Sequence, residues 1–282
     1  MQKEDIYQFQ KKLEEEEKAV LTMKKYLHDI LMFYEYLPID KKVTKERVLA
    51  YKQYLKEHYQ ISSANSMLAA FNLFLSYQGW NTCKVKQFKV QRVFFCRQDK
   101  FLSKDEYERI VNCAKRKGKE QLSLIMQTIC STGIRVSELC YIDVQAVRRG
   151  KALIHNKGKS RVVFLPKELL WLLREYCKSH QIHNGPIFLS KRGKPMDRSV
   201  IWRQMKSLCK EAKVEESKVF PHNLRHLFAL TFYKVKKDLL RLAEILGHTS
   251  IETTRIYTLT TEGEQQQLLS QLGLVLKNKK IT

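Results

Sequence analysis

The chain has 282 residues, 44% of them hydrophobic, which is enough apolar material for one large globular domain or two ordinary ones. A membrane span needs an apolar run of about 18 residues, which the chain lacks, and its N-terminus is too charged for a signal peptide, so we expect a cytoplasmic protein. Its seven scattered cysteines form no C-x-x-C pair, so we expect neither a disulfide framework nor a cysteine zinc site. Its formal net charge of +23, most of it after residue 95, favours a polyanionic partner over a merely soluble basic protein.

Residues 1–85 are predicted to form a small all-α domain. Apolar residues recur at three- and four-residue intervals, which is the period of amphipathic helices packed together. The helices are interrupted at Pro38 and after Gly79, and Thr44 is a suitable N-cap for the helix that follows it. A bundle of short helices satisfies this pattern.

Residues 86–100 are predicted to be a basic linker between two domains. From Asn81 to Lys100, basic and apolar residues alternate without a helical stripe, a pattern that also fits a β-strand. The charge density favours the linker. At 103–106 the sequence Ser-x-x-Glu is a capping box, which indicates that the helices of a second domain, 101–282, begin there.

The second domain is predicted to be mainly helical with a small β insert, so the fold class of the chain is α+β with α dominant. Two strands, "KALIH" and "RVVFLP", flank the turn sequence "NKGKS", and the helix that begins near 120 turns at Thr132-Gly133 and continues as a second helix. Further helices are predicted over residues 167–179, 197–213, 223–233 and 238–246, and a C-terminal helix over 263–280. The apolar stripe of the C-terminal helix fits docking on a neighbouring copy or on its own domain equally well.

Two histidines and an arginine within "PHNLRH" (221–226) permit a metal site or a phosphate site. His222 and His226 have the i, i+4 spacing of zinc ligands, but the acidic residue of an H-E-x-x-H motif is missing, and no other cluster completes a coordination shell, so we expect no metal. Arg225 lies three residues after His222, which places both on one helix face. A guanidinium binds phosphate oxygens bidentately and stays charged, and this favours a phosphate-binding site over a metal site.

Five segments resemble, in order and spacing, the tyrosine recombinase family, which comprises Xer-type recombinases and the integrases of phages and conjugative elements. They are "STGIRVSEL" (131–139), "HNKGKSRVVFLP" (155–166), "HNLRH" (222–226), "LGH" (246–248) and "ETTRIY" (252–257). The helical N-terminal region resembles the family's core-binding domain, so the likeness spans nearly the whole chain. One departure is "KVKK" (234–237), where the family commonly has a glycine before the next helix.

The resemblance implies a role for each of six residues. Arg135 and Arg225 match the two arginines that grip the scissile phosphate, and Tyr257 matches the nucleophile that forms a 3′-phosphotyrosine. His222 matches the general acid/base position, and His248 matches a position that donates to the phosphate.

The sixth residue, Lys157, matches the lysine that protonates the departing 5′ oxygen. Lys159 competes for this role, because Asn156 stands where the family commonly has glycine. His226 is similar to a histidine that the family uses chiefly for support. A free tyrosine has a pKa near ~10, so the attacking phenol needs nearby cations or a base, which the arginines and His222 supply.

The resemblance implies a site-specific DNA recombinase or integrase, of a mobile element or of Xer type, that clamps double-stranded DNA between its two domains. It further implies a homotetramer on core recombination sites, with possible exchange of C-terminal helices, and no cofactor. Accessory proteins are compatible with this reading. Two alternatives remain open: an enzyme like the type IB topoisomerases that cuts and reseals one strand, and a DNA-binding regulator that does not cleave.

Overall fold

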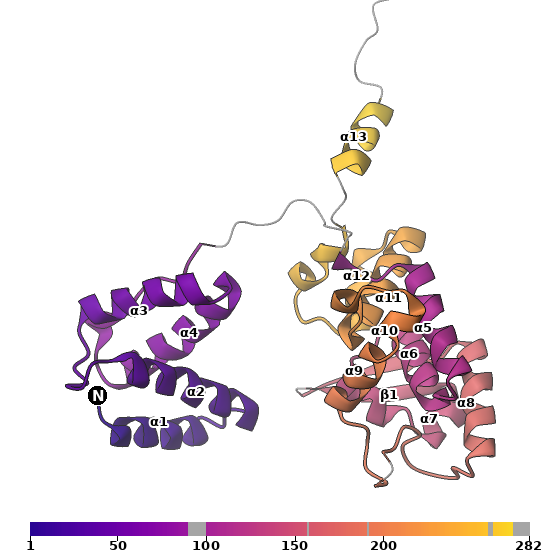
Figure 1. Ribbon diagram of the computed structural model, residues 1–282, viewed down its shortest axis with the longest axis horizontal. Helices are drawn as coiled ribbons and strands as arrows, with labels where there is room; N and C mark the ends of the chain where they lie inside the picture. Colours follow the sequence, from indigo (N-terminus) through magenta and orange to yellow (C-terminus); the bar gives the residue numbers. More distant parts are fainter. Residues whose placement is uncertain (90–99, 157, 191, 259–261, 273–282) are drawn as a thin grey trace, which may run out of the picture. The chain divides into compact units, whose positions relative to one another are not determined.

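The computed structural model describes residues 1–89, 100–156, 158–190, 192–258 and 262–272 (Figure 1). The chain divides into two compact units, Met1–Arg92 and Val93–Thr282. Helices dominate both, and the described residues contain a single two-stranded antiparallel sheet. The predicted fold class, mainly α with a small β insert, is therefore confirmed. Within these ranges, no helix combines the length and the apolar character needed to cross a membrane.

The first unit is a helical bundle. It consists of α1 (Lys3–Glu15), α2 (Val20–Tyr36), α3 (Lys45–His58), α4 (Ile61–Tyr77) and the short 3₁₀ helix η1 (Asn81–Cys83). Helix α4 packs against α2 and α3, and α1 packs against α2. Each helix contributes apolar residues three and four positions apart to one core, among them Phe9, Leu13, Ile30, Phe33, Val48, Leu55, Phe71 and Phe74.

Two asparagines of α4 hold the chain segment that follows η1. The side-chain amide of Asn72 exchanges two hydrogen bonds with the backbone of Val85 (2.8 and 3.0 Å), and Asn65 does the same with Phe88 (3.0 and 2.7 Å). The two asparagines are about two helical turns apart, roughly 10 Å, which is the length of three extended residues. The start of the predicted linker is thus fastened to α4, and residues 90–99 of that prediction lie outside the described residues.

The second unit places its helices around a buried central helix, α6. Its elements before the sheet are α5 (Lys104–Arg116), α6 (Glu120–Thr132), the 3₁₀ helix η3 (Val136–Tyr141) and α7 (Val144–Arg149). Strands β1 (Lys151–Asn156) and β2 (Lys159–Phe164) pair with Leu153 opposite Val162. After the sheet come α8 (Lys167–Ser179), α9 (Arg198–Lys206), α10 (Cys209–Ala212), η4 (Glu216–Lys218), α11 (Pro221–Lys236), α12 (Leu239–Leu246), η5 (Ile251–Thr253), η6 (Arg255–Thr258) and α13 (Glu262–Gln271).

Helix α6 carries buried residues on all its faces, because α5, α8, α9 and α11 all pack against it. It ends at Gly133, whose φ of +68° is the left-handed conformation of a helix C-cap. A Cβ at this glycine would lie 2.5 Å from the ring of Phe228 on α11, so no other residue fits without displacing that ring. The end of α6 and the middle of α11 are thereby brought into direct contact.

Three predicted helices differ from the structure. The helix predicted over 197–213 is broken into α9 and α10. The buried residues keep a helical spacing across the break, so the sequence pattern does not reveal it; they are Met205, Leu208, Cys209 and Ala212. The helix predicted after Gly133 is the 3₁₀ helix η3. The C-terminal helix predicted over 263–280 is described as Glu262–Gln271, and residues 273–282 lie outside the described residues.

Lys237 occupies the turn between α11 and α12 where a glycine was expected. Its φ of +54° is left-handed, which costs a residue with a Cβ about 1–2 kcal/mol relative to glycine in the folded state. We expect Lys237→Gly to raise the free energy of unfolding by about 0.5–1 kcal/mol, since glycine also loses more backbone entropy on folding. Urea denaturation would measure this, with Lys236→Gly, inside α11, as the control that loses stability. An unchanged or lower stability for Lys237→Gly would contradict the expectation.

Candidate active site

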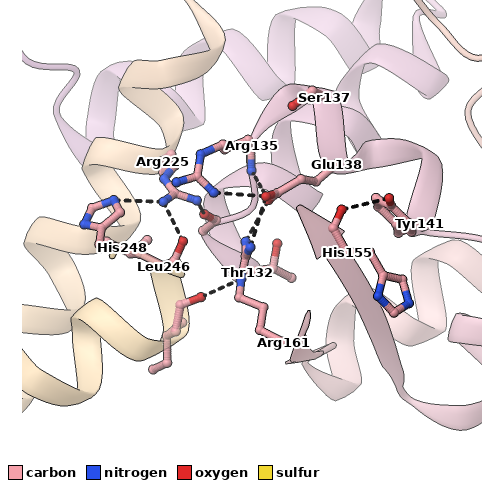
Figure 2. Close-up of polar contacts among 12 residues, drawn as sticks. Thr132, Arg135, Ser137, Glu138, Tyr141, His155, Arg161, Arg225, Leu246 and His248 are labelled. Carbon is pink, nitrogen blue, oxygen red and sulfur yellow. Dashed lines mark hydrogen bonds and ion pairs between the residues drawn. The ribbon is translucent and has the colours of Figure 1, made fainter. Parts of the chain in front are cut away.

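Arg225 lies at the centre of the site and is only 1% exposed. Pro221 occupies the first position of α11, where its fixed φ favours the helical start, and Arg225 projects one turn further on toward the ends of two other helices. Its Nη1 donates to the Gly133 carbonyl at the end of α6 (2.6 Å), and its Nη2 donates to the Leu246 carbonyl at the end of α12 (2.7 Å; Figure 2). Arg225 is therefore a buried residue with fixed partners and not an exposed side chain of the protein surface.

The charge of Arg225 is stabilised chiefly by carbonyl groups. Helix C-termini carry partial negative charge, so the ends of α6 and α12 favour a cation between them. Burial, together with the charge of Arg135, lowers the pKa of Arg225 to about 10, which still leaves it protonated at neutral pH. Its Nε is buried without a hydrogen-bond partner among the described residues. Within the ranges that the structure describes, the hydrogen-bond partners of the guanidinium are two carbonyls and an imidazole and include no carboxylate. A buried cation in this state attracts an anion.

Arg135 is held beside Arg225 by the buried carboxylate of Glu138. Gly133 ends α6, Ile134 inserts into the core, and Arg135 then precedes η3 in an extended conformation. Glu138 accepts hydrogen bonds from the backbone N–H of Arg135 (2.8 Å) and from its Nη1 (3.0 Å; Figure 2). The Arg135 side chain is 35% exposed while Glu138 is 2% exposed, so part of the guanidinium still faces solvent and can meet a ligand.

Arg161 of β2 binds the same carboxylate from the other side. Its Nη1 and Nη2 donate to the two oxygens of Glu138 (3.0 and 2.7 Å), and its Nε donates to the Ile245 carbonyl in the last turn of α12 (3.2 Å). It also packs against Gly247, where a Cβ would lie 2.9 Å from Arg161 Cδ. The Arg161 side chain thus links the β-hairpin to Glu138, which holds Arg135, and to the end of α12, which directly precedes His248.

The carboxylate of Glu138 stays ionised even at a pH far below neutral. Burial opposes ionisation, but hydrogen bonds from Arg161 and from the Arg135 backbone outweigh it and lower the pKa of Glu138 from 4.5 to about 2. Sequence reasoning assigned no role to Glu138 or Arg161. Both lie within quoted motifs, and the Glu138 side chain, three residues after Arg135, closes a capping box on it.

His248 connects Arg225 to the segment that carries Tyr257. Its Nε2 lies 3.0 Å from Arg225 Nη2, and its Nδ1 lies 2.8 Å from the hydroxyl of Thr254. Burial, followed by the charges of Arg225 and Arg135, lowers the pKa of His248 to about 4. The imidazole is therefore neutral at pH 7 when no anion is present.

Tyr257, in η6, is 4% exposed and packs against residues of α11 and α12 of its own chain. Its ring meets His226 edge to face, with centroids 4.9 Å apart, and His226 in turn contacts His222 (5.1 Å) and Phe101 (4.7 Å). Burial raises the pKa of Tyr257, although Arg225 and Arg135 act against the shift. The phenol is thus protonated at neutral pH.

The two histidines of α11 are also neutral at pH 7. Burial and then Arg225 lower the pKa of His222, and burial and then His222 lower that of His226 to about 4. A neutral His222 can accept a proton. His226 packs against the Tyr257 ring, in keeping with the supporting role implied by the resemblance.

Of the six predicted site residues, the structure groups Arg135, His222, Arg225, His248 and Tyr257 around the start of α11. Lys157 lies outside the described residues, and of its competitor Lys159 only the backbone is described, paired with Asn156 at the end of the hairpin. In the described part of the chain, no group of three or more His, Cys, Asp or Glu side chains is placed to hold a metal ion. The grouped residues place two guanidinium groups and two imidazoles beside a tyrosine.

Comparisons with known proteins show the family of the chain. The sequence model of the phage integrase family matches residues 100–264. A tyrosine recombinase, XerA of Pyrococcus horikoshii, is 28% identical over 281 residues, which cover 96% of this chain and 94% of the relative.

Two solved structures share the fold. The XerH site-specific recombinase bound to its difH substrate in a pre-cleavage complex has a TM-score of 0.71 at 21% identity, covering 94% of this chain and 83% of that chain. A lambda integrase tetramer bound to a Holliday junction has a TM-score of 0.71 at 18% identity, covering 90% of this chain and 76% of that chain.

The protein is therefore of the tyrosine recombinase class, a site-specific DNA recombinase, as predicted. The chain belongs to the phage integrase family.

Replacing Glu138 by Gln would remove the charge that two arginines share. We expect Glu138→Gln to lower the free energy of unfolding by about 3 kcal/mol or more at pH 7, because Arg161 then stays buried without its counter-charge. The folded-state pKa is depressed, so the contribution of Glu138 is present above pH 4.5 and is lost as pH falls toward 2.

Urea denaturation at pH 7 and pH 3 would test this prediction. The difference between wild type and Glu138→Gln should shrink at pH 3. Glu108→Gln, at a carboxylate 55% exposed, is the control and should change stability little at either pH. A difference that is constant with pH would show that the ion pairs do not carry the effect.

Proposed function

We propose that the protein cuts and rejoins DNA strands through a covalent 3′-phosphotyrosine formed on Tyr257. The observation that carries the proposal is the placement of a buried guanidinium, Arg225, and a partly exposed one, Arg135, in one site with a buried phenol. Two fixed cations can bind the non-bridging oxygens of a phosphodiester and stabilise the charge of a pentavalent phosphorus.

In the proposed step, the Tyr257 oxygen attacks phosphorus while the bond from phosphorus to the 5′ oxygen breaks. The phenol proton passes to a base, for which neutral His222 is the proposed acceptor. The departing 5′ oxygen takes a proton from Lys157, the general acid implied by the resemblance. The products are a tyrosine–phosphate ester and a free 5′-hydroxyl, and attack by another 5′-hydroxyl reverses every transfer. The ester bond conserves the energy of the phosphodiester, so resealing needs no nucleotide.

DNA is the proposed partner, and the formal charge of +23 supports it. The first unit is proposed to bind core recombination sites as the second unit cleaves them, with four copies assembled on two sites. The lambda integrase tetramer described above supports this assembly by likeness of fold. An enzyme that nicks and reseals one strand is the second candidate, and recombinant products from two marked duplexes would distinguish the two.

A suicide substrate with a nick near the cleavage site would trap the covalent intermediate. We expect wild-type protein to form a covalent protein–DNA adduct, Tyr257→Phe to form none, and Arg225→Lys to form it at least about 10²-fold more slowly, because lysine cannot supply the fork of donors. Tyr233→Phe, in the same unit, is the matched control and should react normally. A normal adduct yield from Tyr257→Phe would refute the proposal. If neither the wild-type protein nor any variant formed an adduct, the protein would instead be a DNA-binding regulator that does not cleave.

The C-terminal helix α13 offers a test of the proposed assembly. If α13 docks on a neighbouring copy, a chain truncated after Thr261 should bind a single site but fail to form the four-copy complex on two sites. Mass measurement of the DNA complexes by light scattering distinguishes the two states. A tetramer of unchanged mass would show that exchange of this helix is not required.

A further inference from the structure

The two hydrogen bonds of His248 determine which ring nitrogen carries its proton. A guanidinium donates hydrogen bonds and accepts none, so His248 Nε2, 3.0 Å from Arg225 Nη2, must accept with its lone pair. In a neutral imidazole the other nitrogen then bears the hydrogen. Nδ1–H therefore donates to the hydroxyl of Thr254, 2.8 Å away.

The charged surroundings of His248 keep the ring neutral in the absence of DNA. The groups that face it are Arg225 and His222 of α11, Arg135 beside η3 and Arg161 of β2, and all four disfavour a second proton. Burial acts in the same direction. The tautomer is thus favoured from both sides of the ring, by Arg225 donating to Nε2 and by the Thr254 oxygen accepting from Nδ1–H.

Thr254 belongs to the segment that carries the nucleophile. It is fully buried between η5 and η6, and its carbonyl accepts the backbone N–H of Tyr257 (3.0 Å). The same residue therefore contacts His248 through its side chain and Tyr257 through its backbone.

We propose that Thr254 is a positioning residue that holds His248 as the Nδ1–H tautomer and links this state to the docking of Tyr257. The inference rests on the proposed cleavage function. It means that His248 Nε2 presents a lone pair to Arg225 and to an incoming phosphate, and that His248 donates to a phosphate oxygen only after Nε2 takes up a proton. When the segment carrying Tyr257 moves away from α11 and α12, Nδ1 loses its acceptor and only Arg225 still favours this tautomer.

Substitutions at Thr254 separate the hydroxyl from the shape of the side chain. We expect Thr254→Val to slow single-turnover cleavage of a suicide substrate by about 10- to 100-fold, because a buried N–H loses its acceptor, with DNA affinity nearly unchanged. Thr254→Ser keeps the oxygen and should restore most of the rate. Thr253→Val, at the exposed neighbouring threonine, is the matched control and should cleave normally.

The tautomer itself can be observed without DNA. In full-length wild-type protein labelled with ¹⁵N-histidine, NMR should show His248 protonated at Nδ1 at pH 7. In Thr254→Val only Arg225 still favours this tautomer, so the Nδ1-protonated share should fall. His248→Gln assigns the signal. Wild-type His248 protonated at Nε2, or a folded Thr254→Val that cleaves at the wild-type rate, would overturn the proposal. Failure of wild-type protein to form an adduct would refute the proposed function instead, and the wild-type NMR result would still decide the tautomer.

Discussion

The site depends on the burial of one guanidinium between the ends of two helices. Arg225 is held by the last carbonyls of α6 and α12, which satisfy its N–H groups and supply partial negative charge. A carboxylate in the same place would supply a full negative charge and cancel the field that an incoming phosphate needs. Carbonyl ligands stabilise the cation and leave most of its charge available, which is the preorganisation expected of a site for a developing oxyanion.

The second arginine is stabilised differently. Arg135 shares the carboxylate of Glu138 with Arg161, so the three groups together carry one net positive charge. Glu138 is deeply buried and accepts donors from both arginines, which fixes Arg135 without using its exposed side. Glycines at the ends of α6 and α12 make this assembly possible, because a side chain at Gly133 would strike Phe228 and one at Gly247 would strike Arg161.

The sequence allowed much of the site to be predicted, through features that are local. The capping box at Ser103, the N-cap at Thr44 and the turn at Gly133 are set by neighbouring residues, and the structure contains all three. The spacing of His222 and Arg225 placed them on one helix. The partnership of Glu138 with Arg161 joins residues that are 23 positions apart, so no local pattern could show it. His248 and Thr254 are only six residues apart, but their contact depends on the irregular turn between α12 and η6, which has no periodic sequence signal. The break between α9 and α10 escaped notice because the buried residues keep a helical period across it.

The protonation states of the site bear on how Tyr257, the proposed nucleophile, would be activated. Burial raises the pKa of Tyr257 despite Arg225 and Arg135, so the phenolate is not preformed. A bound phosphodiester brings negative charge that partly offsets these cations, which disfavours phenolate further and raises the proton affinity of the neutral histidines. The phenol proton must therefore leave during the attack, toward a base whose affinity for it rises when DNA is present. His222, neutral and half-buried beside two arginines, has the properties of such a base. In the proposed mechanism, the protonated tyrosine packed against His226 therefore attacks only when a phosphate occupies the site.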